Sequence, residues 1–259
     1  DSLDCYLFRM PEVYGEDLAS AGFDFLSLAN NLVGDFGVDC VASTETVLET
    51  MGIGWSGRPG TFAQKDKAGL STAFVAFHSG GYCNSSLDIK NAIKMIQELK
   101  ANHDLVLVSV HGGAEGINAI SLPDSIEYYM GENRGHLIQF SRSMIDAGAD
   151  LVFGHGPHVA RAVEIYKDRL IAYSLGNFAT YGRFNLLEIR RFGGILEVTL
   201  NRDGTLKAAE IISIEQKYWG VPLIDAEHRF ARLVDSLSLA DLPLSAANFD
   251  STGHLILGK

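Results

Sequence analysis

The sequence predicts an α/β fold in which a parallel sheet and an antiparallel sheet pack face to face with helices outside, as a four-layer α/β/β/α sandwich. In the first half of the chain, strand patterns alternate with helix patterns, which is typical of parallel strands joined by crossover helices. In the second half, strand patterns follow one another across short turns, which is typical of antiparallel hairpins.

The elements of the first half are recognised by their hydrophobic periodicity. Leu87–Lys100 is the clearest helix, because Ile89, Ile93 and Ile96 recur on one face. Gly148 provides a C-terminal stop for the last helix of this half. The predicted helices are Tyr14–Ala21, Asp39–Met51, Leu87–Lys100 and Asn133–Ala147, and the predicted strands are Phe23–Leu28, Gly69–Phe77, Leu105–Val110 and Asp150–Phe153.

The second half begins with two predicted hairpins. The first turns at Lys167–Arg169, and the second turns at Asp203-Gly204, a pair favoured in two-residue turns. No internal repeat, low-complexity tract or linker is present, so we expect residues 1–259 to form a single domain. The predicted elements are strands at Ala162–Tyr166, Leu170–Ser174, Gly194–Leu200 and Leu206–Glu215, a helix at Ile224–Leu237 and a short strand at His254–Leu257.

The bulk composition indicates a globular protein and excludes some partners. The 259 residues are 47% apolar, enough for a sizeable core, and carry 21 Lys and Arg against 32 Asp and Glu, a net charge of −11. We therefore expect no nucleic-acid partner, because such partners require clustered basic residues. No apolar run approaches the roughly 18–20 residues of a membrane span.

The three cysteines do not predict a thiolate metal site. Cys5, Cys40 and Cys83 are widely spaced and form no CxxC motif. Cys40 falls in a helical pattern, and we expect it to be a small core residue.

The segment Gly154–Val159 is the most informative motif. It follows an apolar strand and places His155 and His158 on one tight turn, where open α/β sheets hold their ligands. Neutral imidazole is the commonest metal ligand among side chains. Glycines on both sides of His155 permit close backbone approach, and Pro157 stiffens the turn. The alternative is a structural turn whose histidines only bind backbone groups.

Other predicted strands end in polar residues of the same kind. His111 ends the third strand, and Glu115 follows it, either orienting an imidazole, acting on a water or lying free in a solvated loop. Asn30 and Asn31 follow the first strand, and Asn177 follows a later one, although asparagine is also an ordinary turn residue. Several strand tips of this kind suggest one shared metal site. The remaining five histidines have no such neighbours, and we assign them no role.

Four ordered motifs resemble the CapA family, the bacterial capsule or poly-γ-glutamate biosynthesis proteins with a metallophosphatase-like fold. The resemblance runs from about Tyr6 to Leu200 and implies the same four-layer sandwich. The motifs are Ser27–Asn31, His111–Glu115, Asp146–Val159 and Tyr173–Phe178.

The resemblance also implies roles for individual residues and a place in the cell. From their positions after the strand tips, and not from the resemblance, Glu115 is the catalytic candidate, and Asn30 and Asn177 are the substrate-binding candidates. The implied cofactor is a divalent metal (Mn, Zn, Fe or Mg), with two ions as the ancestral arrangement. An extracytoplasmic location, at the cell surface or in the periplasm, is expected, with an anionic surface polymer or its biosynthetic machinery as partner. The implied metal-site residues are Asn31, His111, His155 and His158.

Two departures from the family pattern bear on the chemistry. The Gly-Asp and Asn-Leu-Glu motifs that supply carboxylate ligands are absent before Tyr6, so we expect one or more strands upstream of this segment and at most one ion bound here. Leu32 stands where the family has a histidine that protonates the departing oxygen. General acid catalysis of this kind contributes about 10²–10⁴-fold, and leucine cannot provide it.

The sequence therefore predicts one of two main functions. The first is a metal-dependent hydrolase that acts on a phosphoester or on an amide of an acidic polymer. The second is a non-enzymatic accessory or binding role in assembling or exporting a surface polymer. A plain structural or interaction domain is a third, weaker reading.

Overall fold

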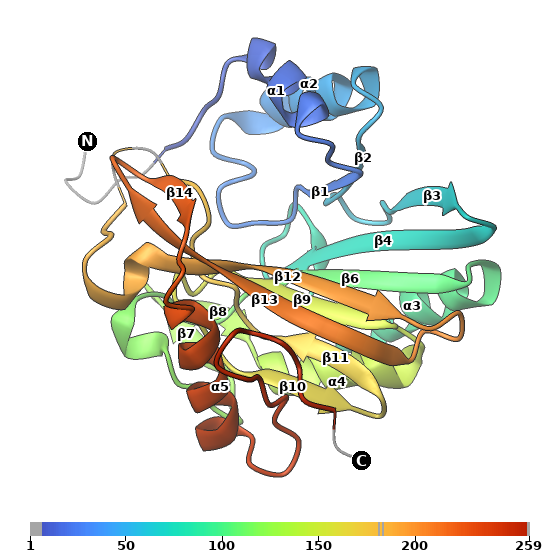
Figure 1. Ribbon diagram of the computed structural model, residues 1–259. Helices are drawn as coiled ribbons and strands as arrows, with labels where there is room; N and C mark the ends of the chain where they lie inside the picture. The colour runs from blue at the N-terminus through green and yellow to red at the C-terminus, as the bar shows by residue number, and fades with distance from the viewer. Residues whose placement is uncertain (1–6, 181, 183, 258–259) are drawn as a thin grey trace.

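The computed structural model describes residues 7–180, 182 and 184–257 (Figure 1). Its centre is a seven-stranded sheet with the strand order β10-β11-β9-β6-β4-β3, in which β5 also pairs with β4. The neighbours β11, β9, β6 and β4 run parallel, and β3 and β10 are antiparallel edge strands. The strands are β3 (Ala63–Lys67), β4 (Leu70–His78), β5 (Asn84–Ser85), β6 (Leu105–His111), β9 (Leu151–His155), β10 (Val163–Tyr166) and β11 (Arg169–Ala172).

Two amphipathic helices cover one face of this main sheet. They are α3 (Ile89–Asn102) and α4 (Leu137–Ala147), and their apolar faces pack on alternate residues of β4, β6 and β9 in one buried cluster. Ile96 is fully buried there, as its position in the predicted stripe requires. Gly148 ends α4 in the left-handed conformation (φ 116°), which confirms the predicted stop.

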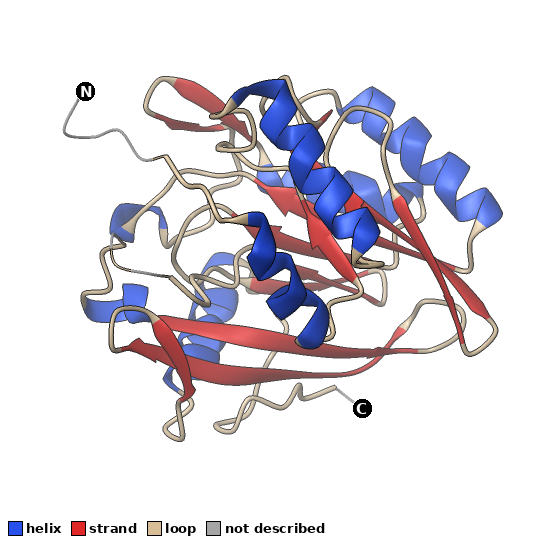
Figure 2. Ribbon diagram, turned by 90° about the horizontal axis from the view of Figure 1, so that it is seen from above, coloured by secondary structure: helices blue, strands red, loops and turns tan. Residues whose placement is uncertain are grey.

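A smaller antiparallel sheet lies against the other face. It contains β12 (Phe192–Leu200), β13 (Leu206–Lys217) and β14 (Val221–Ile224), and it shares a second buried cluster with β10 and β11. Figure 2 shows this sheet and the long helices on opposite sides of the main sheet. The helix α5 (Arg229–Asp241) contacts strands of both sheets. The fold is thus mixed α/β with several sheets, as predicted, and the complete four-layer count stays a prediction.

The N-terminal segment packs beside the main sheet without joining it. Its strands β1 (Phe25–Ser27) and β2 (Gly54–Ser56) form a separate parallel pair, and the rings of Phe25 and Phe74 stack 5.3 Å apart. The segment also contains η1 (Glu12–Tyr14), α1 (Gly15–Ser20) and α2 (Gly37–Thr50); the remaining elements of the protein are η2 (Ile117–Ala119), β7 (Glu127–Tyr129), β8 (Glu132–Gly135) and η3 (Glu188–Arg191).

Three predicted elements are wrong in detail. The β10–β11 hairpin belongs to the main sheet, because β11 pairs with β9 in parallel. Residues 133–135 lie in the strand β8, so α4 begins at Leu137 after the N-cap His136. Residues 221–224 pair with β13, so α5 begins only at Arg229. In each case a pairing partner distant in sequence outweighs the local periodicity.

Two smaller expectations also fail. Cys40 is exposed, because the buried face of α2 consists of Val41, Glu45 and Leu48, and Cys40 lies about 100° around the helix from Val41. The expected strand at residues 254–257 is reduced to isolated bridges made by His254 and Leu255.

Candidate metal and substrate site

Three histidines stand side by side at the carboxyl edge of the main sheet. They end the neighbouring parallel strands β4, β6 and β9, and the strand register pairs His78 with His111 and His111 with His155. Residues paired in this way project from the same face of a sheet. The rings of His78 and His111 lie 5.3 Å apart at 67° to each other. Both strand-tip histidines expected to meet are therefore adjacent, and His78 extends the row.

Backbone hydrogen bonds tie the β6 and β9 tips together. Gly112 N–H donates to the carbonyl of His155 (2.9 Å), and Gly116 N–H donates to the carbonyl of Pro157 (2.9 Å). At Gly156 (φ 122°) a Cβ atom would lie 2.7 Å from the carbonyl oxygen of Gly112. Only glycine permits this backbone approach, which supports the reading of a glycine-flanked turn built for close packing.

His158 is oriented by Asn177. The Asn177 amide nitrogen donates to the carbonyls of His158 (3.2 Å) and Arg190 (3.4 Å), which leaves its Oδ1 to accept from His158 Nδ1 (2.7 Å). In the neutral ring the proton is therefore on Nδ1 and the lone pair on Nε2. Asn177 is nearly buried, so the structure gives it an orienting contact, while the predicted substrate-binding role stays a prediction.

Glu115 lies between a histidine and an arginine. Its Oε2 is 3.8 Å from His158 Nε2, and its Oε1 is 3.2 Å from Nη2 of the buried Arg134. The contact with Arg134 holds the Glu115 carboxylate in place, so Glu115 is not a free solvated loop glutamate. This position is compatible with the catalytic role predicted for it.

A buried ion pair supports the loop that carries Glu115. Arg161, fully buried, donates to both carboxylate oxygens of Glu127 (2.8 and 2.7 Å) and to the carbonyl of Ala119 (2.7 Å). Glu127 in turn accepts from the N–H of Ala114 (3.0 Å). The pair fastens residues 114–127 to the segment that follows His158.

Asn30 and Asn31 lie on the far side of His78. They line a cavity of about 200 Å³ together with His78 and Tyr82. Asn30 Oδ1 accepts from the N–H of Leu32 (2.8 Å), a local turn hydrogen bond of the kind expected for asparagine in any turn. The structure thus places the asparagine loop beside the histidine row.

The histidines of the row are uncharged at neutral pH. Burial, and then the nearby Arg134, lower the pKa of His78 to about 4. Burial lowers the pKa of His155 to about 4. Burial, followed by the neighbouring histidines and Arg134, holds the pKa of His111 well below its usual value. Neutral rings keep a lone pair available to a cation.

The donor atoms at this edge are of the kinds that bind metal ions, and one of them is buried without a hydrogen bond to the described residues. His111 Nε2 is buried and has no hydrogen-bond partner in the described part of the chain, which is unusual for a buried polar atom. Imidazole nitrogen and amide oxygen suit Zn, Mn or Fe. Among residues 7–180, 182 and 184–257, however, no three His, Cys, Asp or Glu side chains are grouped closely enough to hold an ion. The metal roles of Asn31, His111, His155 and His158 stay predictions.

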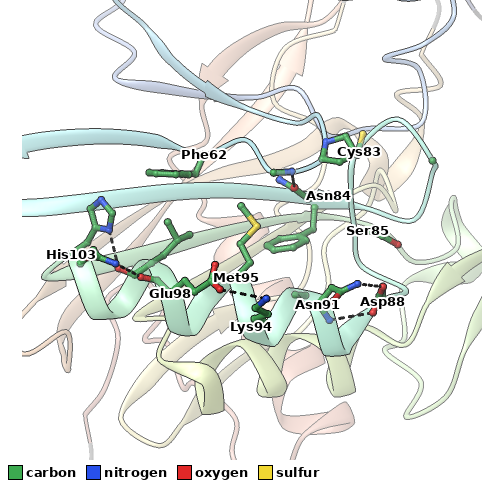
Figure 3. A pocket seen from close by; sticks show the side chains of 17 residues that line it. Phe62, Cys83, Asn84, Ser85, Asp88, Asn91, Lys94, Met95, Glu98 and His103 are labelled. Atoms are coloured by element: carbon green, nitrogen blue, oxygen red, sulfur yellow. Dashed lines mark hydrogen bonds and ion pairs between the residues drawn. The ribbon is translucent and has the colours of Figure 1, made fainter.

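A larger cavity lies elsewhere, along α3. Its volume is about 710 Å³, and it is lined by Phe62, Met95 and His103 among others, but by none of the predicted site residues. Figure 3 shows that the side chains of α3 form its floor, with Asp88 and Asn91 joined by hydrogen bonds at one end. Within the described residues, no helix is long and apolar enough to span a membrane.

Comparison with known proteins decides the family. The profile of the family described as "Bacterial capsule synthesis protein PGA_cap" matches residues 1–181, which include the histidine row and both asparagine motifs. The chain belongs to this family. The resemblance predicted from the four motifs is confirmed.

Individual relatives agree with this assignment. The chain is 30% identical over 178 residues to the capsule biosynthesis protein CapA of Bacillus anthracis, covering 61% of the chain and 40% of that protein. It is 31% identical over 178 residues to the PGA biosynthesis protein CapA of Bacillus subtilis, covering 62% and 43%. A probable polyglutamine synthesis accessory protein of Mycobacterium tuberculosis is 32% identical over 74 residues, covering 29% and 16%. The chain spans about two fifths of the length of the two Bacillus proteins.

Sequence reasoning missed two residues of the site. His78 was assigned no role, although it follows a strand pattern that ends at the same sheet edge as His111. Counting β4 with the other strand tips would have found it. Arg134 had no local signal, because it is brought to the histidines by the β7–β8 hairpin.

Replacing Glu127 should show how strongly the loss of the buried pair between Arg161 and Glu127 destabilises the protein. In Glu127→Ala the Arg161 guanidinium loses both oxygens while staying buried, and we expect the free energy of unfolding to fall by about 3–5 kcal/mol. Urea unfolding measures this change. Glu98→Ala, which removes an exposed pair with Lys94, is the control and should change stability by less than about 0.5 kcal/mol. Equal effects of the two variants would contradict the assignment.

The neutral histidines should make stability depend on pH. Their pKa is about 6.5 in the unfolded chain and about 4 at His78 and His155 in the folded protein, so between these values the unfolded state binds more protons. Stability present above pH 6.5 is therefore lost as the pH falls toward 4. Urea midpoints recorded with EDTA should fall over this window, less so in His78→Gln, while a His103→Gln control should match the parent. A midpoint that stays constant across the window would show that the rings are not held neutral.

Proposed function

We propose that the carboxyl edge of the main sheet is a divalent-metal site, and that the protein is a metal-dependent hydrolase of capsule or poly-γ-glutamate synthesis. Its substrate would be a phosphoester or an amide of the polymer. The observation that carries this proposal is the row of neutral histidines, in which the buried Nε2 of His111 makes no hydrogen bond to the described residues. The family relationship and the donor chemistry support it.

The residues that would hold the metal are the ones implied by the family motifs. His111, His155 and His158 offer nitrogen donors, and Asn31 offers an amide oxygen. Because these do not complete a coordination sphere among the described residues, we propose that carboxylates outside them contribute the other ligands. A divalent cation, when bound, supplies Lewis-acid polarisation of the substrate.

Side chains and backbone groups of the chain orient the residues of this proposed site. Asn177 fixes the tautomer of His158 so that Nε2 faces Glu115. Glu115, anchored by Arg134, is placed to accept a proton from a water at the histidine edge. The tie between the β6 and β9 tips keeps these groups at constant spacing, which is what positioning catalysis needs.

Leu32 favours a second candidate function. With no histidine at this position the leaving oxygen has no evident proton donor, and the scaffold would then serve as an accessory or binding protein in polymer assembly. The Mycobacterium tuberculosis relative, named a probable synthesis accessory protein, is in line with this alternative.

The family relationship also motivates the wider proposals. We propose that the complete protein has the four-layer sandwich, works outside the cytoplasm and meets an anionic polymer or its biosynthetic machinery. A chain of net charge −11 must bind a polyanion through a local cation and not through its overall field.

Metal analysis tests the first function. After incubation with Mn²⁺ or Zn²⁺ and removal of free ions, we expect at most one ion per chain, because the carboxylate motifs are absent from this sequence. His155→Ala should lose that ion together with any phosphoesterase activity, and the control His103→Ala should keep both. Metal content that is unaffected by His155→Ala would refute the site, whereas a loaded but inert protein would favour the accessory role.

Leu32 gives a second test on two esters. Turnover of an unactivated alkyl phosphate should be poor, whereas an aryl phosphate needs little protonation of its leaving group and should suffer less. Leu32→His should raise the alkyl rate by about 10²-fold or more and the aryl rate by much less. Equal rates on both esters, with no response to the substitution, would show that leaving-group protonation is not missing here.

A further inference from the structure

Unpartnered buried atoms gather at one place in this protein. Seven buried side-chain nitrogen or oxygen atoms among the described residues lack a hydrogen bond, and four of them belong to three neighbouring residues. The four are His111 Nε2, Glu115 Oε1, Arg134 Nε and Arg134 Nη1. Native proteins leave few such groups unsatisfied, and a cluster of them points to a polar ligand.

Of these three residues, Arg134 has the most buried atoms without a hydrogen bond. Its side chain is 5% exposed, yet Nη1 has no hydrogen bond to any of the described residues. Nη2 lies 3.2 Å from Glu115, and Nε lies 3.2 Å from Glu132, whose own side chain is 65% exposed and therefore strongly screened by water. A buried guanidinium with free N–H groups is a binding site for oxygen acceptors, above all for anionic ones.

The described residues leave Nη1 of Arg134 without a hydrogen-bond acceptor. Among the described residues, Glu115 and Glu132 are the acidic side chains paired with Arg134, and its guanidinium carbon lies 5.6 Å from the ring centroid of Tyr129. His78 Nδ1 accepts from the N–H of Gly80 (2.8 Å), which places the ring proton on Nε2, 3.5 Å from the hydroxyl oxygen of Ser79. The contacts with Glu115 and Glu132 involve Nη2 and Nε, so the N–H groups of Nη1 stay without a hydrogen bond to the described residues.

We propose that Arg134 binds an oxyanion of the substrate through Nη1, beside His111. This inference rests on the proposed function, because it takes the histidine edge as the substrate site, and it narrows the substrate to one with a phosphoryl or carboxylate group at the reacting end. On this proposal, the anion would be held by the N–H groups of one buried guanidinium and not by the overall charge of −11.

Calorimetric titration of the chain with two probes tests this binding role. The titrations are done in EDTA, so that metal plays no part, with inorganic phosphate in one series and glutarate in the other. We expect one of the two anions to bind to the parent protein. Arg134→Gln should lower the affinity for that anion by about tenfold or more. The control Arg191→Gln removes the same charge from a half-exposed side chain paired with Glu215, and it should bind like the parent.

The outcomes separate the possibilities. Preferential binding of phosphate supports a phosphoester substrate, and preferential binding of glutarate supports a polymer carboxyl group. Binding of neither anion, or equal binding by the parent and Arg134→Gln, overturns the proposal. The metal content of Arg134→Gln, measured in parallel, should equal that of the parent, so that failure of the anion site is distinct from failure of the metal site.

A second variant covers the case in which Arg134→Gln does not fold, as judged by circular dichroism. Arg134→Lys keeps the charge but replaces the planar fork of N–H groups by a single ammonium. We expect it to fold and to bind the preferred anion several-fold more weakly. Unchanged affinity in Arg134→Lys, together with an unchanged arginine Nε–Hε NMR resonance of the parent on adding the anion, would then refute the role.

Discussion

The buried pair between Arg161 and Glu127 is the constraint on which the arrangement of the site depends. Both side chains are almost completely removed from water, and the cost of burying two charges is met by a bidentate contact and by hydrogen bonds to Ala119 and Ala114. Arg161 follows His158 by three residues, so the pair joins the histidine turn to the loop that carries Glu115. Such a pair contributes more to specifying one geometry than to stability.

The tips of β6 and β9 are held together by close backbone packing. The hydrogen bond from Gly112 to the carbonyl of His155 and the close approach at Gly156 leave no room for side chains between the two tips. The imidazoles therefore project from a rigid edge, on strands whose opposite face is buried under α3 and α4. Precise sites are better carried by such strands than by loops.

Burial also decides the charge state of the site. Burial of all three imidazoles, with Arg134 near His78 and His111, lowers their pKa values, so at neutral pH the edge presents lone pairs and N–H donors instead of positive charge. Arg134 is then the permanent cation next to the row. This division would provide neutral donors for the proposed metal and one guanidinium for the proposed anion.

The sequence by itself determined the α/β class, most helices and strands, and the family, because hydrophobic periodicity and the motifs around His111 and His155 are local properties of the chain. It also placed these two histidines at strand ends, and parallel strands bring such ends to one edge. Only the tertiary structure decided that the β10–β11 hairpin joins the main sheet, that Cys40 faces solvent, and that His78 and Arg134 stand beside His111. These outcomes depend on strand order and on contacts between residues far apart in the chain. Such contacts form only when the chain packs, so local sequence patterns do not predict them.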